Sequence, residues 1–398
     1  MKRMVEFPWL TLRRTSMVVL LLEVGACAQP AEPAGSSSMT TGGDTTTGGD
    51  RADLTFPFPV GIFTGPGAEH ACAHFADGSL RCWGYNASKQ VGVVSGDGWP
   101  RRPTRVPGVF HVVQGTVGHS HTCVRLEDGT GACWGANDWG QLGNGQIGGG
   151  GLPPQPIVDL STIKSLSADC ALLDDGTVYW WGNMLPAGLS GSPVKVGDLI
   201  DVASISCGAA SCAVMKDGTL ECWGGSYEDG VLGDGTTTPR SNPEPVPGLS
   251  GVVEVACGVF HTCARLEEGT IQCWGNNLLG ALGDGTKISR GVPGAVLGLT
   301  MARQVVVGAF HSCALLEDET VQCWGGNESG QLGDGTRGTR LMPVPAKGLT
   351  QVTLLSAGVD FTCAMRKDRS VLCWGRNDRG QLGNGGDADS LVPTPVKW

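Results

Sequence analysis

Sixteen cysteines are the residues of this 398-residue chain whose type and spacing could do chemistry. Paired thiols either oxidise to a disulfide or hold a metal ion such as Zn²⁺. Structural zinc sites usually pair cysteines two to four positions apart, a spacing that does not occur here. We therefore predict no metal and no other cofactor. We also predict six disulfides between cysteines ten positions apart: Cys72/Cys82, Cys123/Cys133, Cys212/Cys222, Cys263/Cys273, Cys313/Cys323 and Cys363/Cys373.

The residues between two paired cysteines explain how the pair could meet. One β-like run ends at Leu266, the next begins at Thr270, and the sequence Glu-Glu-Gly at 267–269 separates them. A three-residue loop with glycine last suits a type I turn followed by a bulge, because glycine adopts the left-handed conformation without a steric penalty. Counting outward from that turn places Cys263 opposite Cys273, with Cα atoms about 4.5 to 5.5 Å apart. Each short closed loop would add about 2 to 3 kcal/mol of stability.

The hairpins belong to a longer repeat, because a Cys-Trp-Gly triplet or a near copy occurs seven times at intervals of 42 to 51 residues. Its tryptophans are Trp83, Trp134, Trp181, Trp223, Trp274, Trp324 and Trp374. A period of this length with 64 glycines and short β-like runs is typical of β-propeller blades. We predict one all-β domain over residues 56–398, a seven-bladed propeller. A strand from residues 60–64 would join the C-terminal residues in one mixed blade and so close the ring.

Three cysteines near the middle of the chain lie outside the ten-residue pattern. Cys170 has lost its partner, because Trp180 stands where the second cysteine belongs. Cys207 and Cys257 each precede a glycine on the first strand of consecutive blades. Equivalent positions on neighbouring inner strands can lie close together, so our hypothesis is a disulfide between Cys207 and Cys257. The alternative is three buried thiols.

The N-terminus has the features of an export signal. Lys2, Arg3, Arg13 and Arg14 precede an apolar run at residues 17–22, which is too short to span a bilayer. The following Val-Gly-Ala-Cys sequence resembles the lipobox of bacterial lipoproteins. That resemblance implies a signal peptide at residues 1–26 and a diacylglycerol on Cys27, whereas the alternative is an ordinary cleaved signal with an incidental cysteine.

Residues 27–55 are rich in Gly, Ser, Thr and Pro, and we interpret them as a lipidated, disordered, low-complexity linker. The chain is therefore expected to be an exported lipoprotein of the bacterial cell envelope, at the outer membrane or cell surface. It would contact the membrane through its lipid anchor only. Six disulfides agree with this location, because they persist in oxidising compartments.

The repeat unit itself carries a family resemblance. It reads Gly-x-x-His-Thr/Ser-Cys-Ala, then Asp-Gly-Thr, Cys-Trp-Gly-x-Asn and Gly-Gln-Leu-Gly-Asp/Asn-Gly, and it is clearest at residues 118–145, 258–286, 308–336 and 358–385. This pattern resembles the regulator of chromosome condensation repeat, which implies a seven-bladed propeller over about residues 60–398. The first and third copies depart most: residues 88–94 lack the Gly-Gln-Leu-Gly block, and the third copy is shortened after Asn183.

The resemblance does not carry one function with it. Eukaryotic members of the family exchange guanine nucleotide on a small nuclear GTPase and bind chromatin, whereas secreted bacterial members use one face of the ring to bind a protein. The formal charge of −10 makes nucleic acid an unlikely partner, because the chain would repel phosphate backbones. We expect no nucleotide and no nucleic acid as ligand.

We predict a non-enzymatic scaffold whose propeller loops bind a protein or a polysaccharide. The irregular insertions at residues 95–105, 148–156 and 226–231 are the expected contact regions. Trp99, Trp139 and Tyr227 lie at these insertions or in the neighbouring loop and are the candidate aromatic anchors. For each of them, the alternative is an ordinary loop residue that packs on its own blade.

Two repeated polar positions have both a binding and a structural interpretation. His70, His121, His261 and His311 occupy one blade position and could form a ring that binds metal or anions. The other three blades break this ring, which favours hydrogen bonds to the backbone. Asp234, Asp284 and Asp334 could bind Ca²⁺, but the acidic ligands that calcium needs are missing nearby, so we expect them to cap turns.

The alternative functions are a cell-envelope enzyme such as a sialidase-like glycosidase, or an inhibitor of a secreted enzyme. The Asp-Gly-Thr sequence before each tryptophan resembles the Asp-box of sialidases. Sialidase chemistry would also need three arginines around a carboxylate and a tyrosine nucleophile, and the chain has three tyrosines: Tyr85, Tyr179 and Tyr227. We find neither a Gly-x-Ser-x-Gly elbow nor a His-Glu-x-x-His helix, and we assign no catalytic residue.

Overall fold

The computed structural model of the protein describes residues 57–94, 98–183, 188–225 and 230–398. The signal peptide at 1–26, the lipid site Cys27, the rest of the linker to residue 55 and the anchor Tyr227 lie outside these residues and remain predictions. In the described part, no helix is long and apolar enough to cross a membrane.

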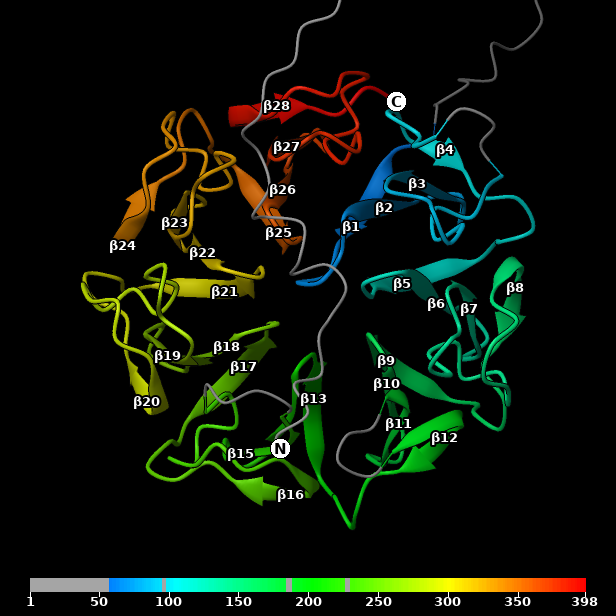
Figure 1. Ribbon diagram of the computed structural model, residues 1–398, viewed down its shortest axis with the longest axis horizontal. Helices are drawn as coiled ribbons and strands as arrows, with labels where there is room; N and C mark the ends of the chain where they lie inside the picture. Colours follow the sequence, from blue (N-terminus) through cyan, green and yellow to red (C-terminus); the bar gives the residue numbers. More distant parts are fainter. Residues whose placement is uncertain (1–56, 95–97, 184–187, 226–229) are drawn as a thin grey trace, which may run out of the picture. The chain divides into compact units, whose positions relative to one another are not determined.

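The described residues fold into seven four-stranded antiparallel sheets arranged as blades around a central channel (Figure 1). This architecture confirms the predicted all-β, seven-bladed propeller. Blades 1 to 7 follow the order of the chain, and in each blade the four strands run in chain order from the channel to the outer edge.

The four strand positions are the same in every blade. The first, innermost strands are β1 (Pro59–Phe63), β5 (Val112–Val117), β9 (Ile163–Ser167), β13 (Val202–Cys207), β17 (Val252–Cys257), β21 (Ala302–Val307) and β25 (Val352–Ala357). The second strands are β2 (His70–Phe75), β6 (His121–Leu126), β10 (Cys170–Leu173), β14 (Ala210–Met215), β18 (His261–Leu266), β22 (His311–Leu316) and β26 (Phe361–Arg366). The third strands are β3 (Leu80–Gly84), β7 (Gly131–Gly135), β11 (Val178–Asn183), β15 (Leu220–Gly224), β19 (Ile271–Gly275), β23 (Val321–Gly325) and β27 (Val371–Gly375). The fourth strands are β4 (Thr104–Arg105), β8 (Gly151–Pro156), β12 (Leu189–Lys195), β16 (Arg240–Pro245), β20 (Arg290–Ala295), β24 (Arg340–Pro345) and β28 (Ser390–Pro395).

The turn between the second and third strands sets the register of each hairpin. In blade 5 the Leu266 amide donates to the Thr270 carbonyl at 2.9 Å, and Gly269 has a φ of +79°. A side chain at Gly269 would be strained at this φ, which explains the glycine. Cys263 pairs with Cys273 in the ladder, as the turn predicted.

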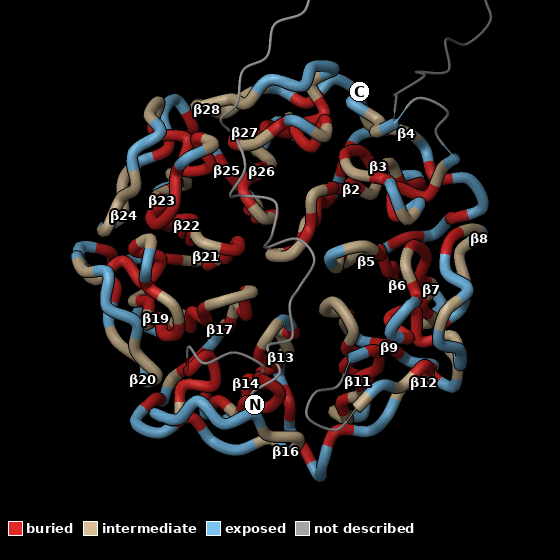
Figure 2. Tube along the Cα trace, viewed as in Figure 1, coloured by how far each residue is buried: buried red, intermediate tan, exposed pale blue. Residues whose placement is uncertain are grey.

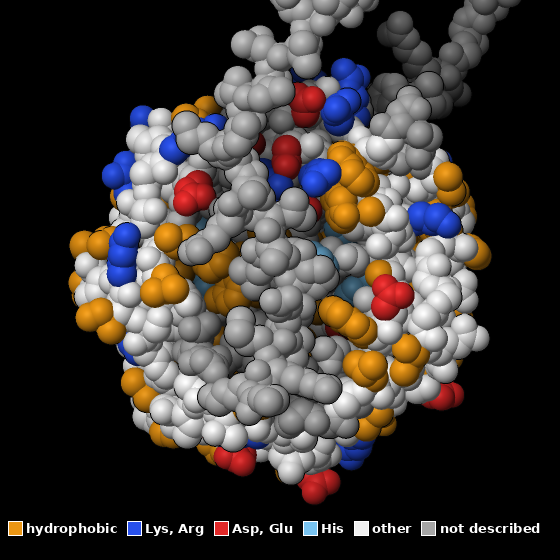
Figure 3. Space-filling view, viewed as in Figure 1, with side chains coloured by type: hydrophobic (Ala, Val, Ile, Leu, Met, Phe, Trp, Pro, Cys, Tyr) orange, Lys and Arg blue, Asp and Glu red, His pale blue; other side chains and the backbone are white. Residues whose placement is uncertain are grey.

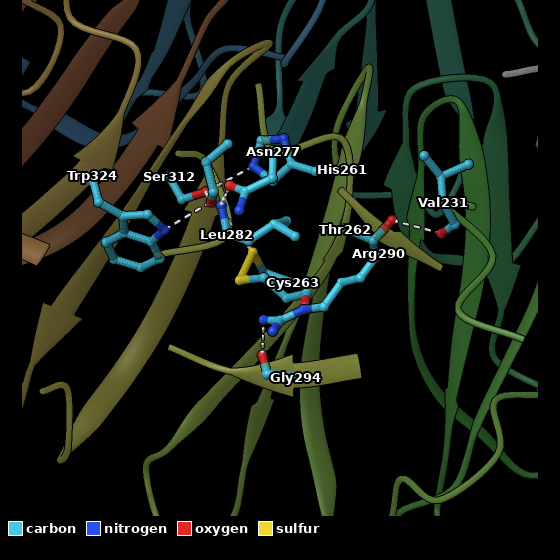
Figure 4. Close-up of a disulfide and its surroundings, with 12 residues drawn as sticks. Val231, His261, Thr262, Cys263, Asn277, Leu282, Arg290, Gly294, Ser312 and Trp324 are labelled. Atoms are coloured by element: carbon cyan, nitrogen blue, oxygen red, sulfur yellow. Dashed lines mark hydrogen bonds between the residues drawn. A yellow bond between two sulfur atoms is a disulfide. The ribbon is translucent and has the colours of Figure 1, made fainter. Parts of the chain in front are cut away.

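All six predicted hairpin disulfides are formed in the structure, and Figure 4 shows the one at Cys263 in blade 5. Each links the second and third strands of one blade and is fully buried. They join Cys72 to Cys82, Cys123 to Cys133, Cys212 to Cys222, Cys263 to Cys273, Cys313 to Cys323 and Cys363 to Cys373. These six disulfides therefore hold single hairpins together and do not tie one blade to the next.

The predicted distance between the paired cysteines was too long. The Cα atoms of the six pairs lie 4.0 to 4.1 Å apart, below the expected 4.5 to 5.5 Å. The reason lies in the ladder of each hairpin: Leu266 and Thr270 exchange a hydrogen bond, so Cys263 and Cys273, three pairs further along, form a pair without one. Strands approach each other most closely at such pairs. The same correction applies to the other five disulfides, those at Cys82, Cys133, Cys222, Cys323 and Cys373.

The hydrophobic core lies between adjacent blades. The seven triplet tryptophans are all buried, and each packs in a cluster with residues of the blade before its own. Figure 2 shows that the buried residues follow the inner strands of every blade. Trp134 of blade 2, for example, lies in one cluster with Leu80 and Cys82 of blade 1. Six of the indole N–H groups also donate across this boundary to a backbone carbonyl at 2.8 to 3.0 Å: Trp83 to Gln381, Trp134 to Gln90, Trp181 to Gln141, Trp274 to Val231, Trp324 to Ala281 and Trp374 to Gln331.

The predicted mixed blade is wrong. β1 pairs with β2 inside blade 1, and blade 7 takes all four of its strands, β25 to β28, from the C-terminal region. The physical reason is that residues 390–395 already supply the outer strand of blade 7 by pairing with β27, so this blade has no strand missing.

Side-chain contacts close the ring instead. Trp83 of blade 1 donates to the Gln381 carbonyl of blade 7 at 2.9 Å, the same bond that links other neighbouring blades. The Trp398 ring packs edge-on against Phe75 and Trp83, with ring centroids 5.1 and 5.8 Å apart. The boundary between blades 7 and 1, here called the seam, is thus built like the other interfaces but without a peptide connection.

Candidate functional site

The antiparallel blades divide the loops between two faces of the ring. Turns between the first and second strands and loops between the third and fourth strands share one face, here called the loop face. Turns between the second and third strands and the connections to the next blade share the other, here called the turn face. Figure 3, a view of one face, shows hydrophobic side chains in separate groups among acidic and basic ones.

The two predicted anchors in the described residues both lie on the loop face. Trp139 belongs to the loop between β7 and β8 and is 47% exposed. Trp99 precedes β4 and is partly buried, because it stacks on Tyr85 of its own blade with ring centroids 4.6 Å apart. The structure does not bring Trp99 and Trp139 into one cluster: each belongs to the loop of its own blade.

A third aromatic pair lies on the loop face at blades 5 and 6. Phe260 and Phe310 occupy equivalent turns before β18 and β22, and their rings stack at 4.7 Å with an interplanar angle of 17°. Leu278, in the neighbouring loop of blade 5, is 63% exposed. Sequence analysis did not single out these residues, although both phenylalanines stand directly before a repeated histidine.

Charged residues gather on the loop face at the seam. Arg376 of blade 7 contacts Asp378 at 2.6 Å and Glu69 of blade 1 at 2.7 Å, with Asp360 at 4.0 Å. Partial burial alone would lower the pKa of Arg376, but these carboxylates raise it above its usual value. This network ties the last blade to the first.

Arg379 completes the seam cluster. Its guanidinium lies 5.1 Å from the centroid of the Trp99 ring and 5.4 Å from that of Tyr85, so blade 7 supplies the cation and blade 1 the aromatic rings. Stacking of this kind orients a guanidinium and leaves its edge available for hydrogen bonds. No sequence signal pointed to Arg379, because the pairing depends on how the two ends of the ring meet.

The channel contains a cavity of about 180 Å³ with uncharged walls. Its hydroxyl groups accept hydrogen bonds from backbone N–H groups of the following blade at 2.8 to 3.0 Å: Thr116 from Ala168, Ser167 from Cys207, Ser206 from Cys257 and Ser356 from Thr64. These hydroxyls therefore join neighbouring blades. Among the described residues, no group of three or more His, Cys, Asp and Glu side chains is placed to hold a metal ion.

The repeated histidines lie between blades, where they contact a hydroxyl of the next blade rather than the predicted backbone. The pairs are His70 Nε2 with Thr122 Oγ1 (2.8 Å), His261 Nε2 with Ser312 Oγ (2.7 Å) and His311 Nε2 with Thr362 Oγ1 (3.0 Å). The hydroxyls in turn donate to the backbone carbonyls of Gln90, Ala281 and Gln331. Each hydroxyl proton is thus in use, so Nε2 must carry the hydrogen that it donates. Figure 4 shows His261, Ser312 and Trp324 at one such interface.

Burial fixes these histidines in their neutral form. It is the main cause that lowers the pKa of His70 and His311 to about 3 and that of His261 to about 4. The cross-blade contact of His121 is a carboxylate instead of a hydroxyl, because its Nε2 lies 2.8 Å from an oxygen of Asp169. The histidines are therefore structural links between blades.

The repeated aspartates cap turns, as predicted. Asp334 Oδ1 accepts hydrogen bonds from the backbone N–H and the hydroxyl of Thr336 at 2.9 and 2.8 Å, and its other oxygen pairs with Arg340 at 2.7 Å. Asp234 and Asp284 make the same contacts with Thr236 and Thr286 and with an arginine six positions on.

The cross-blade disulfide exists, but it joins Cys170 to Cys207, so the predicted Cys207 to Cys257 bridge is wrong. Cys170 faces Trp180 in its hairpin and has no partner within blade 3. Cys207 packs with Cys170 between blades 3 and 4, whereas Cys257 packs between blades 4 and 5 against the hairpin disulfide of blade 4, Cys212–Cys222. Cysteines at the ends of inner strands thus point toward the preceding blade and not toward each other.

Cys257 keeps a free thiol inside this interface. Burial raises its pKa to about 12. A thiol that stays protonated is a poor nucleophile and a poor metal ligand, so Cys257 is inert.

The arginines near Tyr85 do not form a sialidase-like triad. Only the Arg379 guanidinium stacks on the Tyr85 ring among the described residues. Arg376 is held by the carboxylates of the seam, and Arg101 pairs with Asp387 at 3.3 Å.

Comparison with known sequences finds a known repeat in the C-terminal part of the chain. The regulator of chromosome condensation (RCC1) repeat matches residues 217–265, 268–315, 318–365 and 368–398. A second description of the same repeat matches residues 252–281, 302–331 and 352–381. Residues 217–398 are RCC1 repeats. The Trp-to-carbonyl bond and the hairpin disulfide extend beyond this RCC1 region into blades 1 and 2.

Two curated relatives match part of this chain. The RCC1 domain-containing protein RUG3, mitochondrial, of Arabidopsis thaliana is 29% identical over 158 residues, which are 35% of this chain and 35% of that protein. Protein pim1 of Schizosaccharomyces pombe is 30% identical over 148 residues, 31% of this chain and 27% of that protein. The matches thus span about a third of the length of these relatives.

Solved RCC1-type propellers share the fold. Prp20p of Saccharomyces cerevisiae has a TM-score of 0.71 at 21% identity, with 80% of this chain and 86% of that chain covered. The structure of Kap60 bound to yeast RCC1 (Prp20) gives a TM-score of 0.71 at 20% identity, with 91% of each chain covered. Human WBSCR16 gives a TM-score of 0.53 at 21% identity, with coverages of 85% and 81%. Identities this low establish a common fold and no common activity.

Proposed function

We propose that the chain is an exported, lipid-anchored and non-enzymatic scaffold that binds a partner protein through its loop face. The observation that carries this proposal is the set of aromatic side chains on that face: Trp139, the Tyr85/Trp99 pair and the Phe260/Phe310 pair. Such side chains dominate the energetics of protein interfaces, because they bury a large area at a small cost in side-chain entropy.

The scaffold beneath these side chains is rigid. The carbonyls of Gln90, in the loop of Tyr85 and Trp99, and of Gln141, in the loop of Trp139, each accept a hydrogen bond from a buried tryptophan of the next blade. A preformed loop loses little conformational entropy when a partner binds, which favours affinity. The repeated histidines and aspartates are engaged in structural contacts, which supports a binding role over a catalytic one.

The relatives provide a precedent for a protein partner rather than a polysaccharide. The structure of Prp20p was described together with its binding to Gsp1p and histones, and a second structure holds yeast RCC1 bound to Kap60. None of these partners is expected here, because the predicted export signal and the hairpin disulfides both support a location outside the cytosol. The inhibitor of a secreted enzyme is a special case of the same proposal.

Site-specific photocrosslinking on intact cells tests which face of the ring binds the partner protein. A benzophenone amino acid is placed at Trp139 or Leu278 on the loop face, and at Phe110 or Ile200 on the turn face; all four side chains are 47 to 72% exposed. We expect protein adducts from the loop-face positions only. Adducts from the turn face alone, or recovery of glycans without protein, would overturn the proposal.

The lipid anchor is tested separately with Cys27→Ser. We expect the parent protein to take up an alkyne fatty acid and to sediment with membranes, and the variant to do neither. If the variant remains membrane-bound and labelled, Cys27 is not the lipid site.

A further inference from the structure

Arg379 is held in place on the loop face by aromatic rings and makes no hydrogen bond to a carboxylate of the described residues. The rings of Tyr85 and Trp99 orient its guanidinium from across the seam, and the side chain is 37% exposed. Within the described residues, the closest carboxylate to Arg379 is Asp378, whose oxygen lies 3.9 Å from Nε, too far for a hydrogen bond. The outer edge of the guanidinium therefore has no anionic partner in the described structure.

Asp378 is not available to Arg379, because other groups use both of its oxygens. Its Oδ2 accepts a hydrogen bond from Arg376 at 2.6 Å, and its Oδ1 accepts one from the Gln381 side chain at 3.4 Å. The charge of Asp378 is thus directed toward Arg376, which also contacts Glu69. The two arginines of this loop differ in that Arg376 makes short contacts with two carboxylates, at 2.6 and 2.7 Å, whereas Arg379 has only the 3.9 Å contact of its Nε with Asp378.

Other loop-face arginines resemble Arg376. Arg240, Arg290 and Arg340 each contact an aspartate of their own loop at 2.7 to 3.2 Å. These pairs are structural, because the aspartate also caps a turn. Arg379 stands at the position that Trp139 occupies in blade 2, one residue before the loop glycine. In both blades this position presents a large side chain to the solvent instead of completing an internal ion pair.

We propose that Arg379 anchors a carboxylate of the partner protein, while Tyr85 and Trp99 receive the apolar side chain next to it. A planar guanidinium forms two parallel hydrogen bonds with a carboxylate, and the aromatic stack has already restricted its rotamers. The partner class is therefore a protein segment with a glutamate or aspartate beside an aromatic or aliphatic residue. This inference rests on the proposed function and names the chemistry that the loop face recognises.

Binding of the mature chain to defined polymers tests the anchor. The probes are a random copolymer of glutamate and tyrosine, a copolymer of lysine and tyrosine, and polygalacturonate as an anionic polysaccharide. We expect the glutamate/tyrosine copolymer to bind, more weakly at high salt, and Arg379→Met to weaken it about tenfold to a hundredfold. Arg379→Lys keeps the positive charge but cannot make the two parallel hydrogen bonds of a guanidinium, so it should weaken binding less than Arg379→Met does.

Arg369→Met is the matched control. The Arg369 guanidinium also stacks on an aromatic ring, 3.4 Å from the centroid of Phe58, but it belongs to a turn on the opposite face. This variant should bind the copolymer like the parent chain. Equal affinity of Arg379→Met and the parent would overturn the inference, as would Arg379-dependent binding of polygalacturonate without binding of the peptide.

The crosslinking experiment separates this inference from the proposed function. If a loop-face partner is captured equally well by Arg379→Met, the anchor is wrong and the proposed function stands. If no partner protein is captured but the copolymer still depends on Arg379, the carboxylate site is real and the proposed function fails.

Discussion

Two interfaces of the ring link adjacent blades by different means: hydrogen bonds between blades 5 and 6, and a disulfide between blades 3 and 4. At the first, His261 contacts Ser312 at 2.7 Å, and Ser312 and Trp324 both donate to the Ala281 carbonyl. At the second, Ala168 stands at the histidine position, and Trp223 Nε1 has no acceptor among the described residues. A disulfide between Cys170 and Cys207 joins these two blades. At this interface, where the histidine is missing, a covalent bond joins the two blades.

This difference implies that pH and redox conditions weaken different parts of one ring. Protonation weakens the interfaces at which a neutral buried histidine links two blades. Reduction of the disulfide between Cys170 and Cys207 weakens the interface between blades 3 and 4, which has no such histidine.

Acid should produce the largest effect. In the unfolded chain a histidine binds a proton below a pKa of about 6.5, whereas His70, His261 and His311 bind one only below about 3 to 4 when folded. The unfolded state binds more protons between these values, so stability falls as the pH drops from about 6.5 toward 3. Each histidine adds up to about 1.4 kcal/mol per pH unit.

Urea unfolding at several pH values measures this slope. His261→Gln should reduce the slope of unfolding free energy against pH by up to about 1.4 kcal/mol per pH unit, the contribution of one proton, because glutamine does not titrate. A slope that does not change would show that the carboxylates alone cause acid unfolding.

Removal of the cross-blade disulfide should have the next largest effect. Cys170→Ala with Cys207→Ala opens a loop of 37 residues, which the chain-entropy model equates with about 4 kcal/mol. Hydrogen exchange should rise first in β10 and β13. The control pair Cys313→Ala with Cys323→Ala removes a hairpin disulfide from blade 6, and its effect should stay in β22 and β23. If exchange in blades 5 and 6 rises as much as in blades 3 and 4, the two interfaces do not differ as described.

Ser312→Ala should cost about 1 to 3 kcal/mol, because it leaves the buried Nε2 of His261 without its partner. Ser312→Thr should restore most of this loss, since Thr122 plays the same role for His70. Ser211→Ala, at the equivalent position beside Ala168, should cost less. Equilibrium unfolding of the three variants compares them, and equal losses for Ser312→Ala and Ser211→Ala would contradict the relay.

The smallest effect concerns Cys207 and Cys257, which occupy equivalent positions: Cys207 forms a disulfide and Cys257 is a free thiol. In the native protein iodoacetamide should leave Cys257 unmodified at pH 8, because burial raises its pKa to about 12. After denaturation without reductant, the lipidated chain should expose one thiol. Peptide mapping that assigned this thiol to Cys170 or Cys207 would reverse the disulfide described here.

Local features of the fold could be predicted from sequence, because nearby residues determine them. In blade 5 the turn that ends at Gly269 sets the register that brings Cys263 opposite Cys273. Blades 6 and 7 form the same turn with Glu319 and Arg369 in the left-handed conformation, at φ values of +67° and +66°. The capping role of Asp334 follows equally from its own turn. Both depend on residues within ten positions of each other, so a single repeat contains all the information needed.

Features that join different blades could not be predicted in the same way. The disulfide partner of Cys207 depends on which neighbouring blade its side chain faces. The spacing of the cysteines along the chain does not show whether that is the preceding or the following blade. The Arg379 stack depends on the meeting of residues almost 300 positions apart. The mixed blade failed for a related reason: residues 390–395 were not recognised as a complete outer strand.

The bond from Trp83 to the Gln381 carbonyl makes the seam equivalent to the links between consecutive blades. No strand is exchanged there, so the order in which the blades follow one another is not needed to hold the circle. A circularly permuted gene that joined residue 398 to residue 57 through a short spacer and began at another blade-to-blade connection should yield the same circle. Any blade could then be synthesised first.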